Sequence, residues 1–206
     1  MIFALTMQAV SNIHSRHILH NDFNDNNLLF DDYLNPVCID FGFGRPFHIA
    51  GEQGLEILTF TQTGTHYYAS HEALCSRMPG GILQGFTSTK GDVYAVTAVL
   101  FHIIFCKDTL RPLAFDRGNP PIYWEQRLSL VYECLQPLNT MRFVLSLYRQ
   151  CLQFDPLMRP SAATAVQNAR QFAKIFLPPD ASWALDQVLD GSLKHYPWDL
   201  LRILDP

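Results

Sequence analysis

A polar loop between two apolar segments is the feature of this chain that most restricts its fold. Residues 19–30 read LHNDFNDNNLLF, so a histidine and a run of aspartate and asparagine side chains lead directly into an apolar stretch. Asp and Asn bond to nearby backbone groups and therefore favour turns. A simple turn needs only one or two of them. The additional Asp and Asn residues therefore predict a loop of defined conformation that holds a cation or a proton acceptor.

The segments on either side of this loop predict a helix and a small β-hairpin. Before the loop, apolar residues recur at helical spacing from Phe3 to Ile13, so the chain is expected to begin inside an amphipathic helix. After it, two short apolar runs, residues 28–30 and 37–39, are separated by the turn-rich DDYLNP and predict a hairpin that ends at Asp40.

The rest of the chain is expected to be mainly helical. A long irregular segment follows the hairpin, over residues 41–70, and loops of this length are usually functional or disordered. Proline and glycine then punctuate a series of apolar-periodic segments. The expected helices cover residues 92–106, 122–135, 141–152 and 161–176. Residues 177–206 are interpreted as a C-terminal extension that adds packing.

Composition excludes several classes of protein. The 206 residues include 48% hydrophobic and 17% charged residues, which is a globular composition with enough apolar surface for a core. The formal charge is −4 with only four lysines, so neither nucleic acid nor a membrane surface is an expected partner. The apolar, uncharged run at residues 93–106 is too short to cross a bilayer.

Cysteine usage predicts an intracellular protein of the cytoplasm or nucleus. The five cysteines are scattered, odd in number and never arranged as CxxC, a pattern typical of reduced thiols. The apolar start has no positive leading region and no small-residue cleavage site, so it is not interpreted as a signal peptide.

Three motifs follow one another in a fixed order. His20-Asn21-Asp22 has Asn27 five residues after its aspartate, Asp40-Phe41-Gly42 follows at a strand end, and GTHYYASHE comes some twenty residues later. Together they resemble the H-R-D-x-x-x-x-N, D-F-G and A-P-E motifs of eukaryotic protein kinases. GDVYAVTAVL and CLQFDPLMRPS extend the likeness. The resemblance implies an α+β protein-kinase-like fold, with residues 1–176 forming a mainly α-helical C-terminal lobe whose short β-hairpin carries the catalytic and DFG loops.

The resemblance also implies a phosphoryl transfer site that uses ATP and Mg²⁺. Such a site works by positioning the reactants and neutralising phosphate charge. Asp22 would orient or deprotonate a substrate hydroxyl, whereas Asn27 and Asp40 would bind magnesium through hard oxygen ligands. The implied partners are ATP and a protein substrate whose acceptor is a serine or threonine hydroxyl.

Other residues are implied to be structural. Glu72 and Arg159 correspond to a buried ion pair of the family, and loss of one partner from such a pair costs about 3–5 kcal/mol. His20 is expected to be a packed residue and not a catalytic base. The remaining structural positions implied by the resemblance are Phe41, Gly42 and Asp92.

The chain departs from the family pattern at several positions. Asn21 replaces the arginine that receives an activation-segment phosphate, so we do not expect switching by phosphorylation of Thr59, Thr61 or Thr63. Asn24 stands at the catalytic position where serine/threonine kinases place a lysine, and the lost positive charge is expected to slow transfer. No glycine-rich loop precedes the catalytic loop.

The missing glycine-rich loop leads to a further expectation: the sequence contains the C-terminal lobe without an N-terminal lobe. Apolar surface would then remain for that lobe or for another partner, and little turnover is expected from these residues alone.

Two alternative functions and one alternative site remain open. The first function is that of a catalytically inactive pseudokinase lobe acting as a binding module. The second is a small-molecule kinase of the aminoglycoside or choline kinase type, against which GTHYYASHE and DPLMRP argue. The alternative site is zinc bound by His14, His17 and His20, and it is disfavoured because three imidazoles so close to a helix end are not expected to converge.

Overall fold

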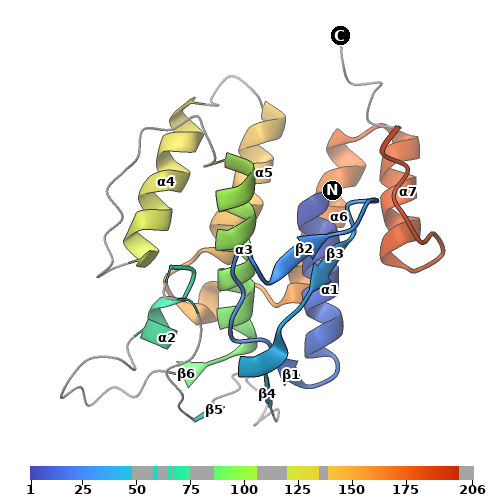
Figure 1. Ribbon diagram of the computed structural model, residues 1–206. Helices are drawn as coiled ribbons and strands as arrows, with labels where there is room; N and C mark the ends of the chain where they lie inside the picture. Colours follow the sequence, from blue (N-terminus) through green and yellow to red (C-terminus); the bar gives the residue numbers. More distant parts are fainter. Residues whose placement is uncertain are drawn as a thin grey trace.

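The computed structural model is mainly helical, with a few short strands (Figure 1). The structure describes residues 1–47, 58–59, 65, 67–74, 86–105, 120–134 and 139–199. The helices are α1 (Ile2–His14), α2 (His71–Leu74), α3 (Thr89–Phe105), α4 (Pro120–Cys134), α5 (Asn139–Cys151), α6 (Ala162–Phe176) and α7 (Pro179–Leu189), with 3₁₀ turns η1 (Phe41–Phe43) and η3 (Pro156–Met158).

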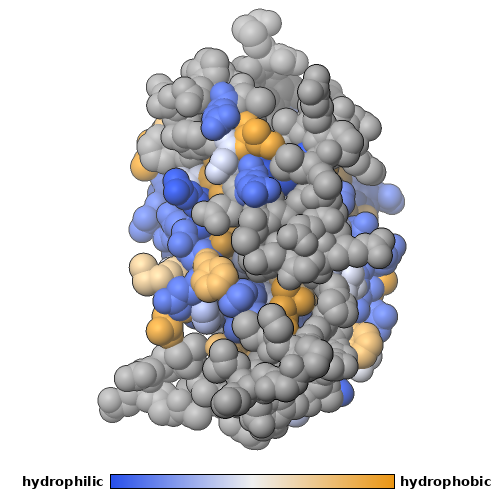
Figure 2. Space-filling view, turned by 90° about the vertical axis from the view of Figure 1, so that its left-hand side faces the viewer, coloured by the Kyte–Doolittle hydropathy of each residue, from blue (hydrophilic) through white to orange (hydrophobic). Residues whose placement is uncertain are grey.

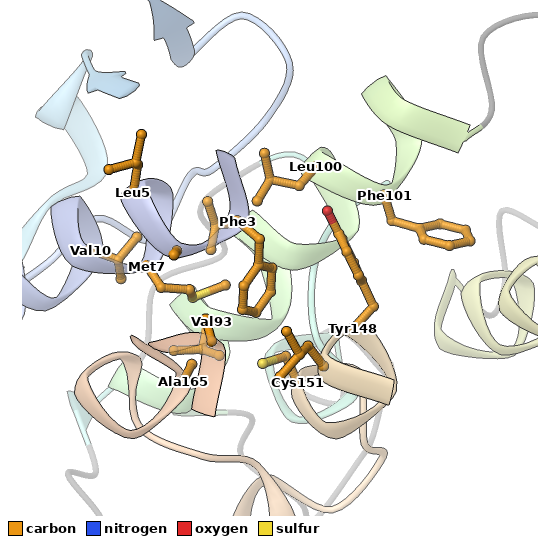
Figure 3. Packing of buried hydrophobic residues seen from close by; sticks show 14 of the residues in the cluster. Phe3, Leu5, Met7, Val10, Val93, Leu100, Phe101, Tyr148, Cys151 and Ala165 are labelled. Carbon is orange, nitrogen blue, oxygen red and sulfur yellow. The ribbon is translucent and has the colours of Figure 1, made fainter. Parts of the chain in front are cut away.

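Helix α3 is the centre of the core. Its residues from Val93 to Phe101 are almost all buried, on every side of the helix, which is the pattern of a helix enclosed by other elements. Helices α1, α5 and α6 pack around it. Figure 3 shows side chains from these helices meeting in the core: Phe3, Met7, Val93, Leu100, Tyr148, Cys151 and Ala165.

The strands are short and pair in twos. Strands β2 (Leu28–Phe30) and β3 (Pro36–Cys38) form an antiparallel hairpin in which Leu29 faces Val37. Strand β1 (Ile18–Leu19) pairs with β4 (Arg45–Pro46), and β5 (Leu58–Thr59) pairs with β6 (Phe86–Thr87). Each pair is also antiparallel. The hairpin therefore lies immediately after the polar loop, as predicted.

The predicted fold class is confirmed, and the helix boundaries agree with expectation to within a few residues. The pattern of apolar residues located the first helix and the four later ones: α1 and α6 carry a buried stripe, whereas α3 is apolar on all sides. Helix α6 begins after Ser161, whose hydroxyl accepts a hydrogen bond from Thr164 N at 3.1 Å and so caps the helix. Helix α7 lies within the extension, for which no helix was predicted.

The described surface is mixed in polarity. Figure 2 shows hydrophilic and hydrophobic side chains interspersed among the described residues of one face. None of the helices within the described ranges is both long enough and apolar enough to span a bilayer. Among the sequence expectations, those for Thr61, Thr63, Cys75 and Cys106 lie outside the described residues.

Candidate functional site

Asp92 anchors the backbone at the start of the polar loop. It lies in the first turn of α3, is only 3% exposed, and accepts hydrogen bonds from His20 N at 2.8 Å and Asn21 N at 2.9 Å. The His14 imidazole lies 3.0 Å from the same carboxylate. Asn21 has φ 63°, a left-handed conformation that asparagine tolerates better than most residues. Asp92 therefore fixes the loop to the central helix.

His20 is a packed residue with both ring nitrogens engaged. It is fully buried, and its ring stacks on Phe23 at 4.2 Å between centroids and contacts Phe41 at 4.7 Å. Its Nε2 lies 2.9 Å from the carbonyl oxygen of Ile39, which can only accept, so Nε2 carries the proton. Nδ1 accepts from Asp22 N at 3.3 Å. The imidazole thus joins the polar loop to the end of the hairpin.

The Asp22 carboxylate is held in place by three donors. Its Oδ1 accepts from Thr65 N at 2.7 Å and from Thr65 Oγ1 at 2.9 Å. Its Oδ2 accepts from Asn27 Nδ2 at 3.1 Å. A carboxylate offers about four acceptor positions, so one position on Oδ2 remains for another donor. Asp22 is therefore oriented but not fully satisfied by the described residues.

Asn24 folds the loop around Asp22. Its Oδ1 accepts from Asn26 N at 2.8 Å and Asn27 N at 3.2 Å. Its Nδ2 donates to Thr65 Oγ1 at 3.0 Å and to the Asp22 carbonyl oxygen at 3.3 Å. All of these bonds lie within the site, and the side chain is 6% exposed. Asn24 is a neutral residue whose hydrogen bonds hold the loop, so it supplies no cation to a phosphate.

Asn27 lies opposite Ile39 at the base of the hairpin, and Asp40 is the next residue after Ile39. Ile39 N donates to the Asn27 carbonyl oxygen at 3.0 Å, which continues the β2–β3 ladder toward Asp40. Asn27 Nδ2 also donates to the Asp22 carbonyl oxygen at 2.9 Å, and no described residue donates to its Oδ1. Asp40 is exposed. The buried Asn27 side chain thus lies at the base of the hairpin, and the exposed Asp40 carboxylate follows the residue that pairs with Asn27.

The backbone after Asp40 is shaped by glycine. Asp40 has φ 59°, and its Oδ1 accepts from Gly42 N at 3.1 Å. A Cβ added at Gly42 would lie 3.0 Å from that same oxygen, which is tighter than ordinary contact. The glycine therefore permits the turn that presents the Asp40 carboxylate.

The side-chain oxygens of Asn27 and Asp40 are ligands that suit a magnesium ion better than a transition metal. Mg²⁺ prefers hard oxygen ligands and commonly takes one or two carboxylates, leaving several positions to water and phosphate. The structure groups no three His, Cys, Asp or Glu side chains for a metal within the described ranges. The imidazoles of His14, His17 and His20 contact Asp92, Phe47 and Ile39 respectively.

Glu72 and Arg159 form the expected buried ion pair. Arg159 Nη1 lies 2.5 Å from Glu72 Oε1, and Nη2 lies 2.8 Å from Oε2, so the contact is bidentate. Arg159 is 1% exposed and Glu72 is 5% exposed. The pair joins α2 to the segment that precedes α6.

A small pocket opens beside Asp22. Small side chains form much of its wall, and no lysine or arginine is among the described lining residues. Ser70 Oγ is buried there without a hydrogen-bond partner among the described residues. The lining comprises Asn21, Asp22, Phe23, Thr65, Ala69, Ser70, Ala73, Thr87, Ser88, Gly91, Asp92 and Ala95.

Two residues of the site were not singled out from the sequence. Thr65 lies within GTHYYASHE, but the motif match alone does not show that its hydroxyl and its backbone N–H donate hydrogen bonds to the Asp22 carboxylate. His14 was considered only as a metal ligand, whereas it contacts Asp92 at the end of α1. A basic residue in the last turn of a helix is a weak signal for such a contact.

The two described thiols near the core are unreactive in character. Burial, with a smaller contribution from the negative charge of Asp92, raises the pKa of Cys38 to about 11. Burial also raises the pKa of Cys151 to about 12. Both thiols therefore stay protonated near neutral pH, and neither is a nucleophile for this site.

Comparison with known proteins identifies the family of this chain. Residues 1–169 match the family model described as the protein kinase domain. The serine/threonine-protein kinase TOUSLED of Arabidopsis thaliana is 27% identical over 159 residues, which cover 75% of this chain and 22% of that protein. A probable serine/threonine-protein kinase of Dictyostelium discoideum is 29% identical over 169 residues, covering 81% of the chain and 35% of the relative.

A third relative matches at similar identity and coverage. The LysM domain receptor-like kinase 3 of Arabidopsis thaliana is 26% identical over 178 residues, covering 75% of the chain and 26% of that protein. The chain thus spans between about a fifth and a third of the length of these relatives. With its motifs assembled around Asp22 and its match over residues 1–169, the chain belongs to the protein kinase domain family.

Proposed function

We propose that this domain serves ATP-dependent phosphoryl transfer to a serine or threonine hydroxyl of a protein. The observation that carries the proposal is the Asp22 carboxylate, which Thr65 and Asn27 orient while one acceptor position on Oδ2 stays free. The pocket beside Asp22 offers an approach for a substrate side chain. The names of two relatives, which are serine/threonine-protein kinases, support the choice of acceptor.

Asp22 would act on the substrate hydroxyl. A hydroxyl hydrogen pointing at Oδ2 would place the oxygen within hydrogen-bond reach, which is the geometric requirement for a general base. Because Thr65 and Asn27 fix the carboxylate beforehand, the orientation costs little when the substrate arrives. Thr65 and Asn27 would therefore be positioning residues.

Asn27 Oδ1 and the Asp40 carboxylate would hold the magnesium ion that accompanies ATP. When bound, the ion neutralises phosphate charge. The support is the hydrogen-bond direction at Asn27: its Nδ2 donates toward Asp22, so its oxygen faces away and stays available. Asp40 adds a full negative charge at an exposed position beside it.

The metal assignment can be tested on the chain itself. Mn²⁺, a paramagnetic substitute for Mg²⁺, should broaden the NMR resonances of Asn27 and Asp40 before those of the rest of the protein. Asp40→Asn should abolish this selective broadening, whereas Asp32→Asn, which alters another exposed carboxylate at the hairpin turn, should leave it unchanged. Equal broadening in the Asp40 variant would contradict the assignment.

The catalytic assignment needs a separate measurement. In the chain joined to an N-terminal kinase lobe, transfer of labelled phosphate from ATP to a mixed library of Ser/Thr peptides should be lost in Asp22→Ala while Mn²⁺ broadening at Asp40 persists. Loss of both in the same variant would mean that Asp22 only supports the loop. Transfer by the joined protein no faster than by its Asp22→Ala variant would refute catalysis.

A catalytically inactive binding module is the second candidate, and Asn24 favours it. Serine/threonine kinases place a lysine at this position, whereas Asn24 is neutral and its amide is engaged within the loop. Under this alternative, metal or nucleotide would bind without transfer. The two measurements above separate the candidates, because only the first predicts product that depends on Asp22.

A further inference from the structure

The chain beyond α7 turns back toward the β2–β3 hairpin. Gly191 has φ 80°, and two backbone N–H groups just after it donate to the Gln187 carbonyl oxygen at 2.8 and 3.0 Å, which closes the helix end. Tyr196 is then buried, and its hydroxyl donates to the Ala181 carbonyl oxygen at 3.1 Å. We call residues 190–199 the C-terminal strap. It lies beyond the part that matches the kinase family.

The strap contacts the turn of the hairpin through two side chains. Trp198 Nε1 donates to the Tyr33 carbonyl oxygen at 2.8 Å. The His195 ring stacks on the Tyr33 ring at 3.9 Å with 14° between the planes. Asn35 Nδ2 donates to Asp31 Oδ2 at 3.0 Å and lies 2.8 Å from His195 Nδ1, which must accept because an amide nitrogen only donates. Figure 1 shows the β2–β3 turn reaching toward α7.

Apart from the strap, the turn end of the hairpin is held by bonds within the turn, where the Asp31 carboxylate accepts from Tyr33 N at 2.9 Å, Asn35 N at 2.8 Å and Asn35 Nδ2 at 3.0 Å. Each strand has three residues, and an isolated two-stranded hairpin is marginally stable at best in water. One face is open, since Leu29 is 44% exposed and Val37 is 42% exposed. At the other end, the ladder bond from Ile39 N to the Asn27 carbonyl oxygen directly adjoins Asp40. Opening of the turn would therefore propagate along a short ladder to the proposed metal ligands.

We infer that the strap holds the hairpin closed and so sets the relative position of Asn27 and Asp40. Trp198 and His195 are then positioning residues of the site, although they belong to the extension. The part that concerns metal binding rests on the proposed function. The part that concerns hairpin opening does not, because it depends only on the contacts between the strap and the turn.

Hydrogen exchange measured by NMR tests the inference, with Trp198→Phe as the main variant. This change keeps an aromatic ring but removes the indole N–H that bonds to Tyr33. Loss of one such bond is expected to speed exchange of the Leu34 and Ile39 amides about fivefold. Trp183→Phe is the matched control, since Trp183 lies on α7 and is 59% exposed. His195→Ala is a second variant, which independently removes the ring stacking on Tyr33.

The pattern of exchange decides the outcome. Faster exchange at Ile39 in Trp198→Phe and His195→Ala, with α3 amides and the Trp183 control unchanged, supports the strap. Acceleration confined to Leu34, or equal acceleration in α3, overturns it, because the strap would then act only on the turn or on the whole fold. Unchanged exchange at both amides also overturns it.

Mn²⁺ affinity gives a second measurement, which would not change if the strap only added packing. The strap variants should weaken Mn²⁺ binding at Asn27 and Asp40 several-fold, whereas Trp183→Phe should not. Unaltered Mn²⁺ affinity despite faster Ile39 exchange would overturn the claim that the strap positions the ligands. Failure of the unaltered chain to bind Mn²⁺ would instead refute the proposed metal site. Hydrogen exchange of the hairpin amides would still test whether the strap holds the hairpin closed.

Discussion

Replacement of Arg159 by methionine should strongly destabilise the protein, because one guanidinium satisfies several buried acceptors. Arg159 bonds both oxygens of Glu72 and donates to the carbonyl oxygens of Gln153 at 2.6 Å, Phe154 at 2.9 Å and Lys90 at 3.3 Å. Methionine fills similar space but offers no donor. A buried carboxylate and three carbonyl groups would lose their partner together.

The magnitude follows from the environment of Glu72. This residue is 5% exposed, and breaking a buried pair by removing one partner costs about 3–5 kcal/mol. For a chain of this size, each 1 kcal/mol lowers Tm by about 2–4 °C, so Arg159→Met should lower Tm by roughly 6–20 °C. Arg159→Lys should lie between the variant and the unaltered protein, because lysine keeps the charge but not the planar fork.

Urea unfolding followed by circular dichroism gives the free energy of unfolding for each variant. Asp190→Asn is the matched control: this carboxylate also pairs with an arginine, Arg170, but its side chain is 53% exposed, so its loss should cost no more than about 1 kcal/mol. The double variant Glu72→Leu/Arg159→Met should recover part of the stability, because no charge is left buried without its partner.

Two results would refute this account of the ion pair. The first is a cost below about 1 kcal/mol for Arg159→Met, since a buried and fully bonded pair cannot be removed so cheaply. The second is a double variant as unstable as the sum of its two single changes, since contacting charges should couple.

Three further outcomes are expected. Asn24→Ala should loosen the polar loop and speed exchange of the Asn27 amide, whereas Asn26→Ala, at an exposed side chain, should not; NMR would show the difference. Asp92→Asn should destabilise the protein by about 1–3 kcal/mol in urea unfolding, because its carboxylate accepts two buried N–H groups. At pH 8, folded Cys38 should react with iodoacetamide about a hundredfold more slowly than in urea, by peptide mass spectrometry, since burial raises its pKa from 9.0 to about 11.

The direction of the Cys38 effect on stability follows from the same shift. Folding favours the neutral thiol, so its contribution is fully present below pH 9 and is lost as the pH rises through about 11. A Cys38→Ser variant should remove this part of the alkaline loss of stability. Unfolding curves at pH 8 and pH 10.5 that respond equally in both proteins would contradict the assignment.

Sequence reasoning located most of the helices and the hairpin because their signals are local. The buried stripe of α1 and the all-round apolar character of α3 follow directly from residue order. The motif order around Asp22, Asn27 and Asp40 also predicted which segments should meet. Helix α7 escaped prediction because small residues such as Ala181 and Ala184 form much of its buried face and make a weak apolar pattern.

What the sequence determined by itself was the position of the helical stripes, the hairpin and the polar loop, together with the kinase resemblance that they carry. Only the tertiary structure decided how the polar groups are used. Thr65 donates hydrogen bonds to Asp22, 43 residues away in the sequence, and Trp198 donates one to Tyr33, 165 residues away. The Asn24 amide is used up by hydrogen bonds within the site. Such contacts have no periodic signal, since hydrogen bonds between distant segments depend on how packed elements place individual atoms and not on neighbouring residues.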